Sequence, residues 1–343
     1  MSNLIESTCG TIQPNYPKAA SNQDMMDFTV AIPTYNGEQR LPDVLRRLQT
    51  QTGLEAVNWE VLVVDNNSQD QTAAIVEAFQ TTFSCPLRYC VERQQGASYA
   101  RQRAVREAHS ELIGFLDDDN LPDPGWVLAA YQFAQQHPQA GAYGSRITGE
   151  FEVEPPAHFQ RIAPFMAIVE RGSQPHRYEP EKKLLPPSAG LVVRKQAWLA
   201  HVPEQTLLNR LHFKRSDGND CSEDIEALSY IQQSGWEVWH NPAMRIAHKI
   251  PAWRLERGYL LPLFRSIGLS RCATRLVSMK PHQRWWMTAA YMVSDLRRVV
   301  LHMLKYRAQF KTDLVAACEL ELYFGILISP FYLLAQHLSK EID

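Results

Sequence analysis

Three apolar runs of strand length alternate with helical patterns in the first third of the chain. The runs 28–32, 59–64 and 113–116 are rich in β-branched residues, and each ends in polar residues typical of turns. After the first run, the spacing of Leu41, Val44, Leu45 and Leu48 predicts a helix. After the second run, residues 73–79 predict another helix. This order indicates a parallel sheet with right-handed crossovers.

The predicted topology also indicates where a site would form. Ligands of such sheets bind beyond the carboxyl ends of the strands, where Thr34, Asp65 and the run 117–119 would lie. Polar residues at three strand ends are much harder to attribute to chance than polar residues at one.

The run 117–119 consists of three adjacent aspartates. Like charges in a row repel each other and raise the pKa of each carboxyl group unless a cation offsets them. Carboxylates at a strand end suit Mg²⁺ or Mn²⁺, whose coordination is completed by substrate phosphates. A solvated acidic turn is the alternative, because Asp, Asn and Pro also end strands.

A further segment adds positive charge near the same place. Gly96 precedes a predicted helix that carries Arg101 and Arg103. Amides at a helix N-terminus and guanidinium groups together form a clamp for a diphosphate. Simple solvation remains the alternative for one of the two arginines. Thr34 and Tyr35 could border a nucleotide base, although Tyr35 could equally pack beside the sheet.

These segments together resemble the family 2 glycosyltransferases, which bind nucleotide-diphospho-sugars with the GT-A fold. The resemblance covers about residues 28–250 and rests on five motifs that occur in order: 30–36 (VAIPTYN), 63–68 (VVDNNS), 96–104 (GASYARQRA), 117–119 (DDD) and 222–224 (SED). It implies an α/β fold with a Rossmann-like, mostly parallel sheet flanked by helices. It also implies a transferase of the type used in bacterial polysaccharide biosynthesis.

The resemblance implies donor-side roles for the matching residues. Asp65 would hold the uracil or ribose of a UDP-sugar, and Asp117 and Asp119 would form the metal-binding Asp-x-Asp, with Asp119 as the direct ligand of Mn²⁺ or Mg²⁺. Gln102 stands where many members have Asn. The other donor-binding positions would be Pro33, Thr34, Tyr35, Asn36, Asn67, Gly96, Arg101, Arg103 and Asp118.

His248 resembles the position where some GT-A enzymes supply a third metal ligand. A lone histidine is more often structural, so both interpretations stay open. Trp236, Trp239 and His240 are better explained as packing residues than as a platform for a sugar.

An inverting transfer needs a carboxylate that removes the proton of the acceptor hydroxyl group. The resemblance places this base at Asp224, with Glu223 and Asp220 supporting it or binding the acceptor. Ser222 and Asp224 could instead cap the helix that the following residues predict. The segment 185–194 resembles a strand beneath the acceptor, where Gly190 would allow a close approach of the backbone.

The amino-acid composition indicates the size of the core and the cellular compartment. With 343 residues and 45% hydrophobic content, the chain can bury one large core and an appendage. Residues 1–27 predict a flexible leader, and they lack the basic and apolar regions of a signal peptide. Six cysteines without paired spacing indicate a reduced, cytoplasmic setting.

The C-terminal region 251–343 is predicted to be helical and strongly basic. Residues 254–311 contain twelve Lys and Arg and two acidic residues, which gives a net charge of +10. Tryptophans and tyrosines are interspersed among these basic residues. This mixture is typical of membrane-surface helices, and no nucleic-acid-binding motif accompanies it. The apolar stretch 322–338 contains Pro330 and has the minimum length for a span, which favours a monotopic or re-entrant segment. A helical subdomain packed on the catalytic core is the alternative.

The sequence therefore predicts a leader (1–27), a catalytic domain (28–250) with a nucleotide-binding half (28–122) and an acceptor half (123–250), and a helical region that lies on the inner face of the plasma membrane. The expected activity is metal-dependent, inverting transfer of a sugar from a UDP-sugar to a polysaccharide or a lipid-linked glycan. The alternatives are a sugar-nucleotidyltransferase and a non-catalytic sugar-nucleotide-binding scaffold of a membrane assembly. The first would place a Gly-rich, basic loop after the first strand, and the second would have lost its carboxylates.

Overall fold

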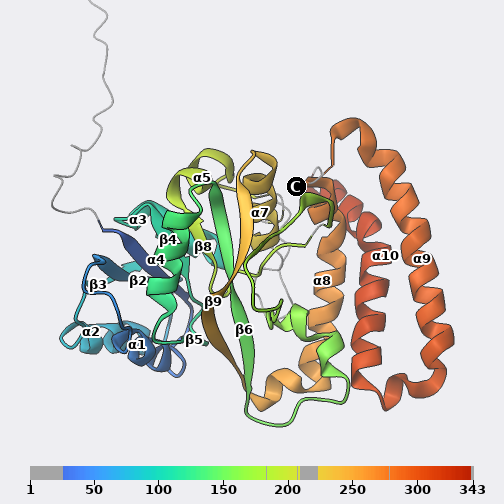
Figure 1. Cartoon of the computed structure of the whole chain (residues 1–343). Coiled ribbons are helices and arrows are strands. Elements are labelled where there is room, and N and C mark those ends of the chain that lie inside the picture. The colour runs from blue at the N-terminus through green and yellow to red at the C-terminus, as the bar shows by residue number, and fades with distance from the viewer. Residues whose placement is uncertain (1–25, 183, 207, 209–222, 278, 341–343) are drawn as a thin grey trace, which may run out of the picture.

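The computed structural model describes residues 26–182, 184–206, 208, 223–277 and 279–340 (Figure 1). The predicted leader lies almost entirely outside these residues. The strands are β1 (Phe28–Thr34), β2 (Trp59–Asp65), β3 (Leu87–Val91), β4 (Leu112–Phe115), β5 (Asn120–Pro122), β6 (Ala140–Phe151), β7 (His176–Arg177), β8 (Val192–Arg194) and β9 (Glu237–Ile250). The α-helices are α1 (Leu41–Gln49), α2 (Thr72–Gln80), α3 (Ala97–Glu107), α4 (Trp126–Gln136), α5 (Lys195–His201), α7 (Glu223–Gln233), α8 (Arg257–Val277), α9 (Arg284–Tyr306) and α10 (Leu314–Lys340).

All of these strands belong to one sheet. Its order is β3-β2-β1-β4-β8-β6-β9-β5, and β7 pairs with β9. The first four strands are parallel, and β6 and β9 form a second parallel pair, whereas β8 and β5 run antiparallel to their neighbours. The predicted mixed α/β fold with a mostly parallel sheet is confirmed.

Both faces of the sheet are buried under helices. Alternating residues of β1 point to opposite faces, so that Val30 and Ile32 pack with α1, α2 and α4 while Ala31 packs with α3, α5 and α7. Burial on both faces explains why these strands are apolar throughout.

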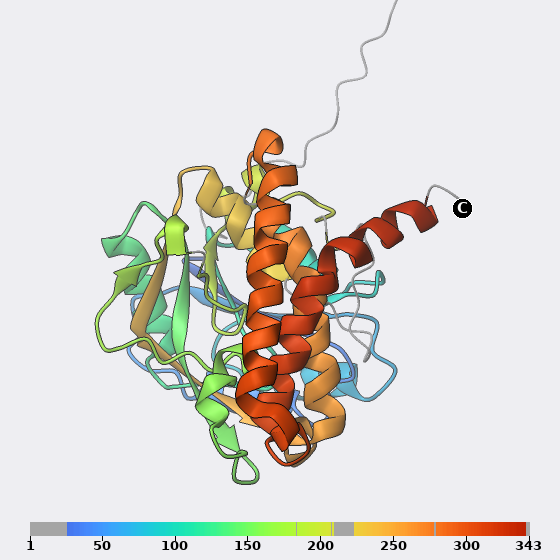
Figure 2. The same cartoon turned by 90° about the vertical axis from the view of Figure 1, so that its right-hand side faces the viewer.

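A separate apolar cluster joins the C-terminal helices to the sheet. It combines residues 159–166, the end of β9 at Ile250, and the facing sides of α8 and α10. Figures 1 and 2 show α9 as the outer helix of this group, and it buries few of its residues: Asp295, Val299 and His302. The helical region is therefore packed on the catalytic core through α8 and α10, and α9 has a large uncovered surface.

Two segments differ in extent from the sequence prediction. The stretch 322–338 belongs to a longer helix, because α10 is continuous from Leu314 to Lys340 and Pro330 lies inside it. By length and composition Leu314–Gln336 could cross a membrane, and 44% of its most apolar window is buried in the protein, so the monotopic or re-entrant placement stays a prediction. The segment 185–194 is not one strand, since only Val192–Arg194 pairs and Gly190 lies in a turn with φ +63°.

The cysteines of the described residues are free thiols: Cys85, Cys90, Cys272 and Cys318. Cys9 and Cys221 lie outside the described residues.

Helices α8 and α10 cross where two glycines meet. A methyl group on Gly268 would lie 2.5 Å from the carbonyl oxygen of Leu322 and 2.9 Å from Cα of Gly325. The two backbones can therefore approach this closely only because neither position carries a side chain.

We expect Gly268→Ala to lower the free energy of unfolding by about 1 to 3 kcal/mol, because the added methyl group must push the two helices apart. Gly258→Ala, in the same helix, is the matched control, since a Cβ there meets nothing within 4 Å. Urea denaturation of both variants measures the difference. Equal stability of the two variants would contradict the close helix contact.

Candidate active site

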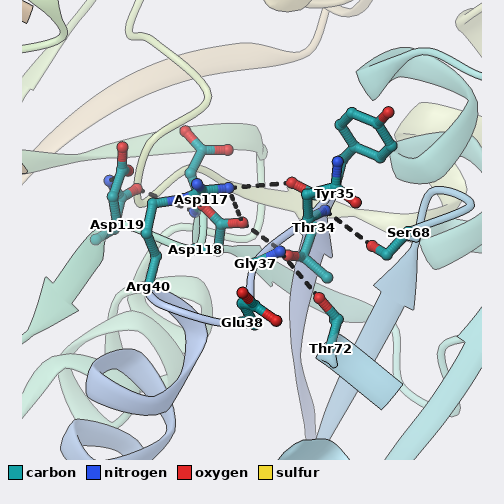
Figure 3. Close-up of polar contacts among 12 residues, drawn as sticks. Thr34, Tyr35, Gly37, Glu38, Arg40, Ser68, Thr72, Asp117, Asp118 and Asp119 are labelled. Atoms are coloured by element: carbon teal, nitrogen blue, oxygen red, sulfur yellow. Dashed lines mark hydrogen bonds and ion pairs between the residues drawn. The ribbon is translucent and has the colours of Figure 1, made fainter. Parts of the chain in front are cut away.

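The site lies at the carboxyl ends of β1, β2 and β4. Thr34 and Asp65 are register partners at the ends of their strands, and the run 117–119 follows β4. The loops after β1 and β2 are joined, because the amide of Gly37 donates to Thr72 Oγ1 at 2.9 Å and the amide of Asn36 donates to Ser68 Oγ at 2.9 Å (Figure 3). These bonds fix the loops that surround the aspartates.

Asp65 is buried, and both of its oxygens accept hydrogen bonds. The backbone N–H of Ser68 donates to Oδ1 at 2.8 Å, and the hydroxyl group of Tyr89 donates to Oδ2 at 2.5 Å. Burial, and then the charge and hydrogen bond of Asp65, raise the pKa of Tyr89 well above its usual value. Asn66 is buried like Asp65, whereas Asn67 is exposed and adopts a positive φ of 67°.

Asp118 anchors the loop after β1. Arg40 binds it in a bidentate manner, with Nε 2.8 Å from Oδ1 and Nη2 2.9 Å from Oδ2, and Thr34 Oγ1 donates to Oδ2 at 2.7 Å (Figure 3). Burial raises the pKa of Asp118, although Arg40 and Thr34 oppose this effect. These bonds make Asp118 an anchor for the loop after β1, and the donor-binding role expected for it stays a prediction.

Asp119 lies beside His248 and Arg254. Its Oδ2 is 3.4 Å from His248 Nε2 and 2.7 Å from Arg254 Nη1, and Nη1 is itself 3.2 Å from His248 Nε2. The pairing of Asn120 with His248 between β5 and β9 brings the histidine here. Burial alone would raise the pKa of Asp119, but His248 and Arg254 hold that pKa well below its usual value.

The donor atoms of Asp119 and His248 suit a divalent cation, and a cationic group already lies between them. Oxygen and imidazole ligands are compatible with Mn²⁺, and Arg254 Nη1 contacts both. Within the described part of the chain, no group of three acidic, histidine or cysteine side chains is close enough to hold a metal in this conformation. Two of the three predicted ligands are therefore together, and Asp117 is oriented toward a different partner.

Asp117 belongs to a series of contacts that reaches Asp224. Arg101 Nη2 is 3.3 Å from Asp117 Oδ1 and donates to Ser188 Oγ at 3.0 Å. The backbone N–H of Ser188 then donates to Asp224 Oδ2 at 2.9 Å. Burial raises the pKa of Asp117, and the charge of Arg101 acts against it. The structure thus connects the predicted metal ligand to the predicted base through one arginine.

Asp224 lies in the first turn of α7, where its Oδ1 accepts the N–H of Ile225 at 2.8 Å. An N-cap side chain accepts from an N–H two or three residues ahead, so this contact is not a cap, and Ser222, the other capping candidate, lies outside the described residues. The N–H of Ser188 also orients this carboxylate. Glu223 begins the same helix, and Asp220 lies outside the described residues.

Several predicted residues are not brought to the carboxylates. Arg103 pairs with Glu107 of its own helix at 2.9 Å, and Tyr35 is 42% exposed. Gln102 is buried between α3 and α5, where it accepts from Trp198 Nε1 at 2.5 Å and donates to the carbonyl of Pro203. Gly190 packs closely against β6, since a Cβ there would lie 2.5 Å from Ser145 Oγ, and its place beneath the acceptor stays a prediction.

Sequence analysis assigned no role to three residues that shape the site: Arg40, Asn66 and Arg254. Asn66 fixes the loop before α3, because its Nδ2 donates to the carbonyls of Glu92 and Gln94 and its Oδ1 accepts the N–H of Gly96. Its place in the motif 63–68 was the one available signal. Arg254 was counted within the basic segment only, and nothing in the sequence distinguished Arg40.

Comparisons with known proteins show which family and fold the chain resembles. Residues 29–198 match the family model described as Glycosyl transferase family 2. The poly(ribitol-phosphate) beta-N-acetylglucosaminyltransferase TarS of Staphylococcus aureus is 31% identical over 113 residues, which are 33% of this chain and 20% of TarS. The glucosyl-dolichyl phosphate glucuronosyltransferase of Haloferax volcanii is 23% identical over 207 residues, 60% of this chain and 63% of that protein.

A solved structure supports the fold. The mannosyltransferase PcManGT of Pyrobaculum calidifontis, in complex with GDP-Man and Mn²⁺, has a TM-score of 0.56 at 16% identity, over 89% of this chain and 87% of that chain. The predicted GT-A class is confirmed by this likeness and by the family match. The match to TarS spans about a fifth of the length of that protein.

Proposed function

We propose that this chain, a member of glycosyl transferase family 2 through residues 29–198, is an inverting transferase. It transfers a sugar from a nucleotide diphosphate, UDP in particular, to a polysaccharide or lipid-linked glycan. The observation that carries the proposal is the series Asp117, Arg101, Ser188, Asp224. The contacts of Arg101 with Asp117 and Ser188, and of Ser188 with Asp224, support the proposal because they join an arginine suited to a diphosphate to the carboxylate proposed as the base.

In this mechanism Asp224 accepts the proton of the attacking hydroxyl group. The N–H groups of Ser188 and Ile225 orient its carboxylate, so the base is held in place before the acceptor binds. Arg101 is positioned to bind the diphosphate that leaves, since a guanidinium group pairs well with phosphate oxygens.

Asp119, His248 and Asp117 are the residues that would hold Mn²⁺ or Mg²⁺. A divalent ion would stabilise the negative charge of the departing diphosphate. Because Arg254 Nη1 now contacts both Asp119 and His248, binding of a metal requires this arginine to turn away from them.

The two alternatives from the sequence have less support. A sugar-nucleotidyltransferase does not agree with the family match, and β1 continues into the Pro33 to Gly37 segment without a basic Gly-rich loop. A non-catalytic scaffold would have no need for Asp65, Asp117, Asp119 and Asp224 in these positions.

The metal assignment predicts that Asp119→Ala weakens the Mn²⁺-dependent part of UDP affinity by at least about tenfold, because a direct ligand is lost. Asp65→Ala should weaken UDP binding with and without metal. Calorimetric titration of UDP in both conditions measures these effects. Arg254→Met is the matched variant, since it removes the competing cation and should leave the Mn²⁺-dependent affinity at least as high as in the wild type. Unchanged affinity in Asp119→Ala would refute the assignment.

The base assignment predicts that Asp224→Asn retains donor affinity and loses about two to four orders of magnitude in turnover, the usual effect of a missing general base. The pH–rate profile should also lose its acidic limb. Retained turnover would mean that another group, such as Glu223 or Asp220, is the base. The nucleotide sugar for this assay can be found first by a screen for slow donor hydrolysis with Mn²⁺.

We further propose that α9 rests on the cytoplasmic face of a membrane. Its exposed apolar residues follow helical spacing along one face and are Val293 (72% exposed), Leu296 (51%), Val300 (46%) and Leu304 (59%). Trp285, 79% exposed, lies near one end of the helix. A stripe of this kind within a segment of net charge +10 fits an anionic lipid surface.

Co-sedimentation with anionic vesicles tests this location. We expect the full chain to bind, Val293→Ser with Leu304→Ser to bind less at every salt concentration, and Arg284→Glu with Arg297→Glu to bind less only at low salt, because salt screens charge but not apolar insertion. Leu199→Ser is the control, since Leu199 is 51% exposed on α5 of the catalytic part. Wild-type protein that stays in the supernatant at low salt would refute membrane docking.

A further inference from the structure

A cavity of about 570 Å³ lies between the catalytic sheet and the C-terminal helices. Arg101, Ser188 and Asp224 line it on the catalytic side, and residues of α8 and α10 line it on the other. The proposed base therefore faces a space that the helical region helps to enclose.

The helical side of this cavity is largely apolar. Leu263 and Ile267 of α8 lie opposite Leu322 and Ile326 of α10, and Phe165 adds an aromatic ring from the segment between β6 and β7. Apolar surface of this extent is unusual around a site for a free sugar, which presents hydroxyl groups on most sides.

The charge of the lining is strongly positive. Among the described residues that line the cavity, Asp224 is the one acidic residue, and five are arginines: Arg101, Arg171, Arg271, Arg275 and Arg298. Arg275 is neutralised by Asp295, with Nη1–Oδ2 and Nη2–Oδ1 distances of 2.6 and 3.1 Å. Arg298 is 4.0 Å from the same carboxylate.

Arg271 differs from these arginines. Within the described part of the chain its side chain forms no hydrogen bond and no ion pair, and the one nearby carboxylate that acts on it, Asp295, is already held by Arg275. Burial, and then the charge of Arg275, lower the pKa of Arg271 below its usual value. A partly buried cation beside a second cation is unfavourable until an anion joins it.

We infer that this cavity binds an acceptor sugar that is linked to a lipid through phosphate, with the phosphate at Arg271 and Arg298, the hydrocarbon chain along α8 and α10, and the attacking hydroxyl group of the sugar toward Asp224. The inference rests on the proposed transferase function and names the acceptor class. Phosphate oxygens match the forked donors of arginine, and the apolar wall covers a hydrocarbon chain.

Decyl phosphate, kept below its micelle concentration, is a direct probe of the cavity. By isothermal titration we expect it to bind at least about tenfold more tightly than inorganic phosphate, because several methylene groups leave water. Decyl maltoside, which has the same chain without charge, should bind more weakly than decyl phosphate by a similar factor.

Three variants separate the two halves of the site. Arg271→Gln should weaken decyl phosphate about tenfold, since a charged hydrogen bond is lost, and Ile267→Ser should weaken decyl phosphate while leaving inorganic phosphate unchanged. Arg265→Gln is the matched control, because Arg265 lies on the same helix, pairs with Glu321 and does not line the cavity. Denaturation curves show whether each variant is folded, and Arg271→Lys replaces Arg271→Gln if the latter is not.

Equal binding of inorganic and decyl phosphate would reduce the site to a free-anion site, and equal binding of decyl maltoside would reduce it to an apolar crevice. Either result, or full affinity in a folded Arg271 variant, overturns the inference. These titrations contain no nucleotide and no metal, so their failure leaves the donor-hydrolysis test of the transferase function intact. Conversely, loss of donor hydrolysis would not affect them.

Discussion

The structure depends on the neutralisation of three adjacent carboxylates at the end of β4. Arg101 of α3 contacts Asp117, Arg40 before α1 binds Asp118, and Arg254 after β9 binds Asp119. Unpaired, these buried charges would be strongly unfavourable. Each arginine comes from a different part of the chain, so the parts can only take the positions in which the three pairs form.

This requirement links the C-terminal helices to the chemistry. Arg254 lies directly between β9 and α8, and the cluster that includes Leu255, Leu260 and Phe264 fixes this junction against the segment 159–166. A shift of α8 relative to the sheet would therefore move the cation that contacts Asp119 and His248. The C-terminal part of the chain therefore contacts both ends of the proposed site, since Arg254 pairs with Asp119 and residues of α8 and α10 line the cavity that Asp224 also lines.

The sequence predicted the parts of the site that depend on local pattern. Strand ends at Thr34, Asp65 and Asp117 follow from apolar runs that stop at polar residues, and parallel order follows from the helices between them. The partners of the aspartates could not be predicted in this way, because Arg254 is 135 positions from Asp119 and meets it only through the pairing of β5 with β9. The length of α10 was missed for a different reason, since packing on α8 stabilises a helix through Pro330 that local propensity would interrupt.

The three aspartates differ in what they can do, and their environments explain why. Asp118 has three hydrogen bonds from Arg40 and Thr34, so a ligand could use it only by breaking the loop that it holds. Asp119 and Asp117 have arginine partners that phosphate groups can attract, because guanidinium pairs with phosphate as readily as with carboxylate. Binding of a diphosphate would draw Arg101 and Arg254 toward the ligand and release both carboxylates for a cation. In such a site the substrate completes the metal site, and the arginines balance the aspartates until the substrate arrives.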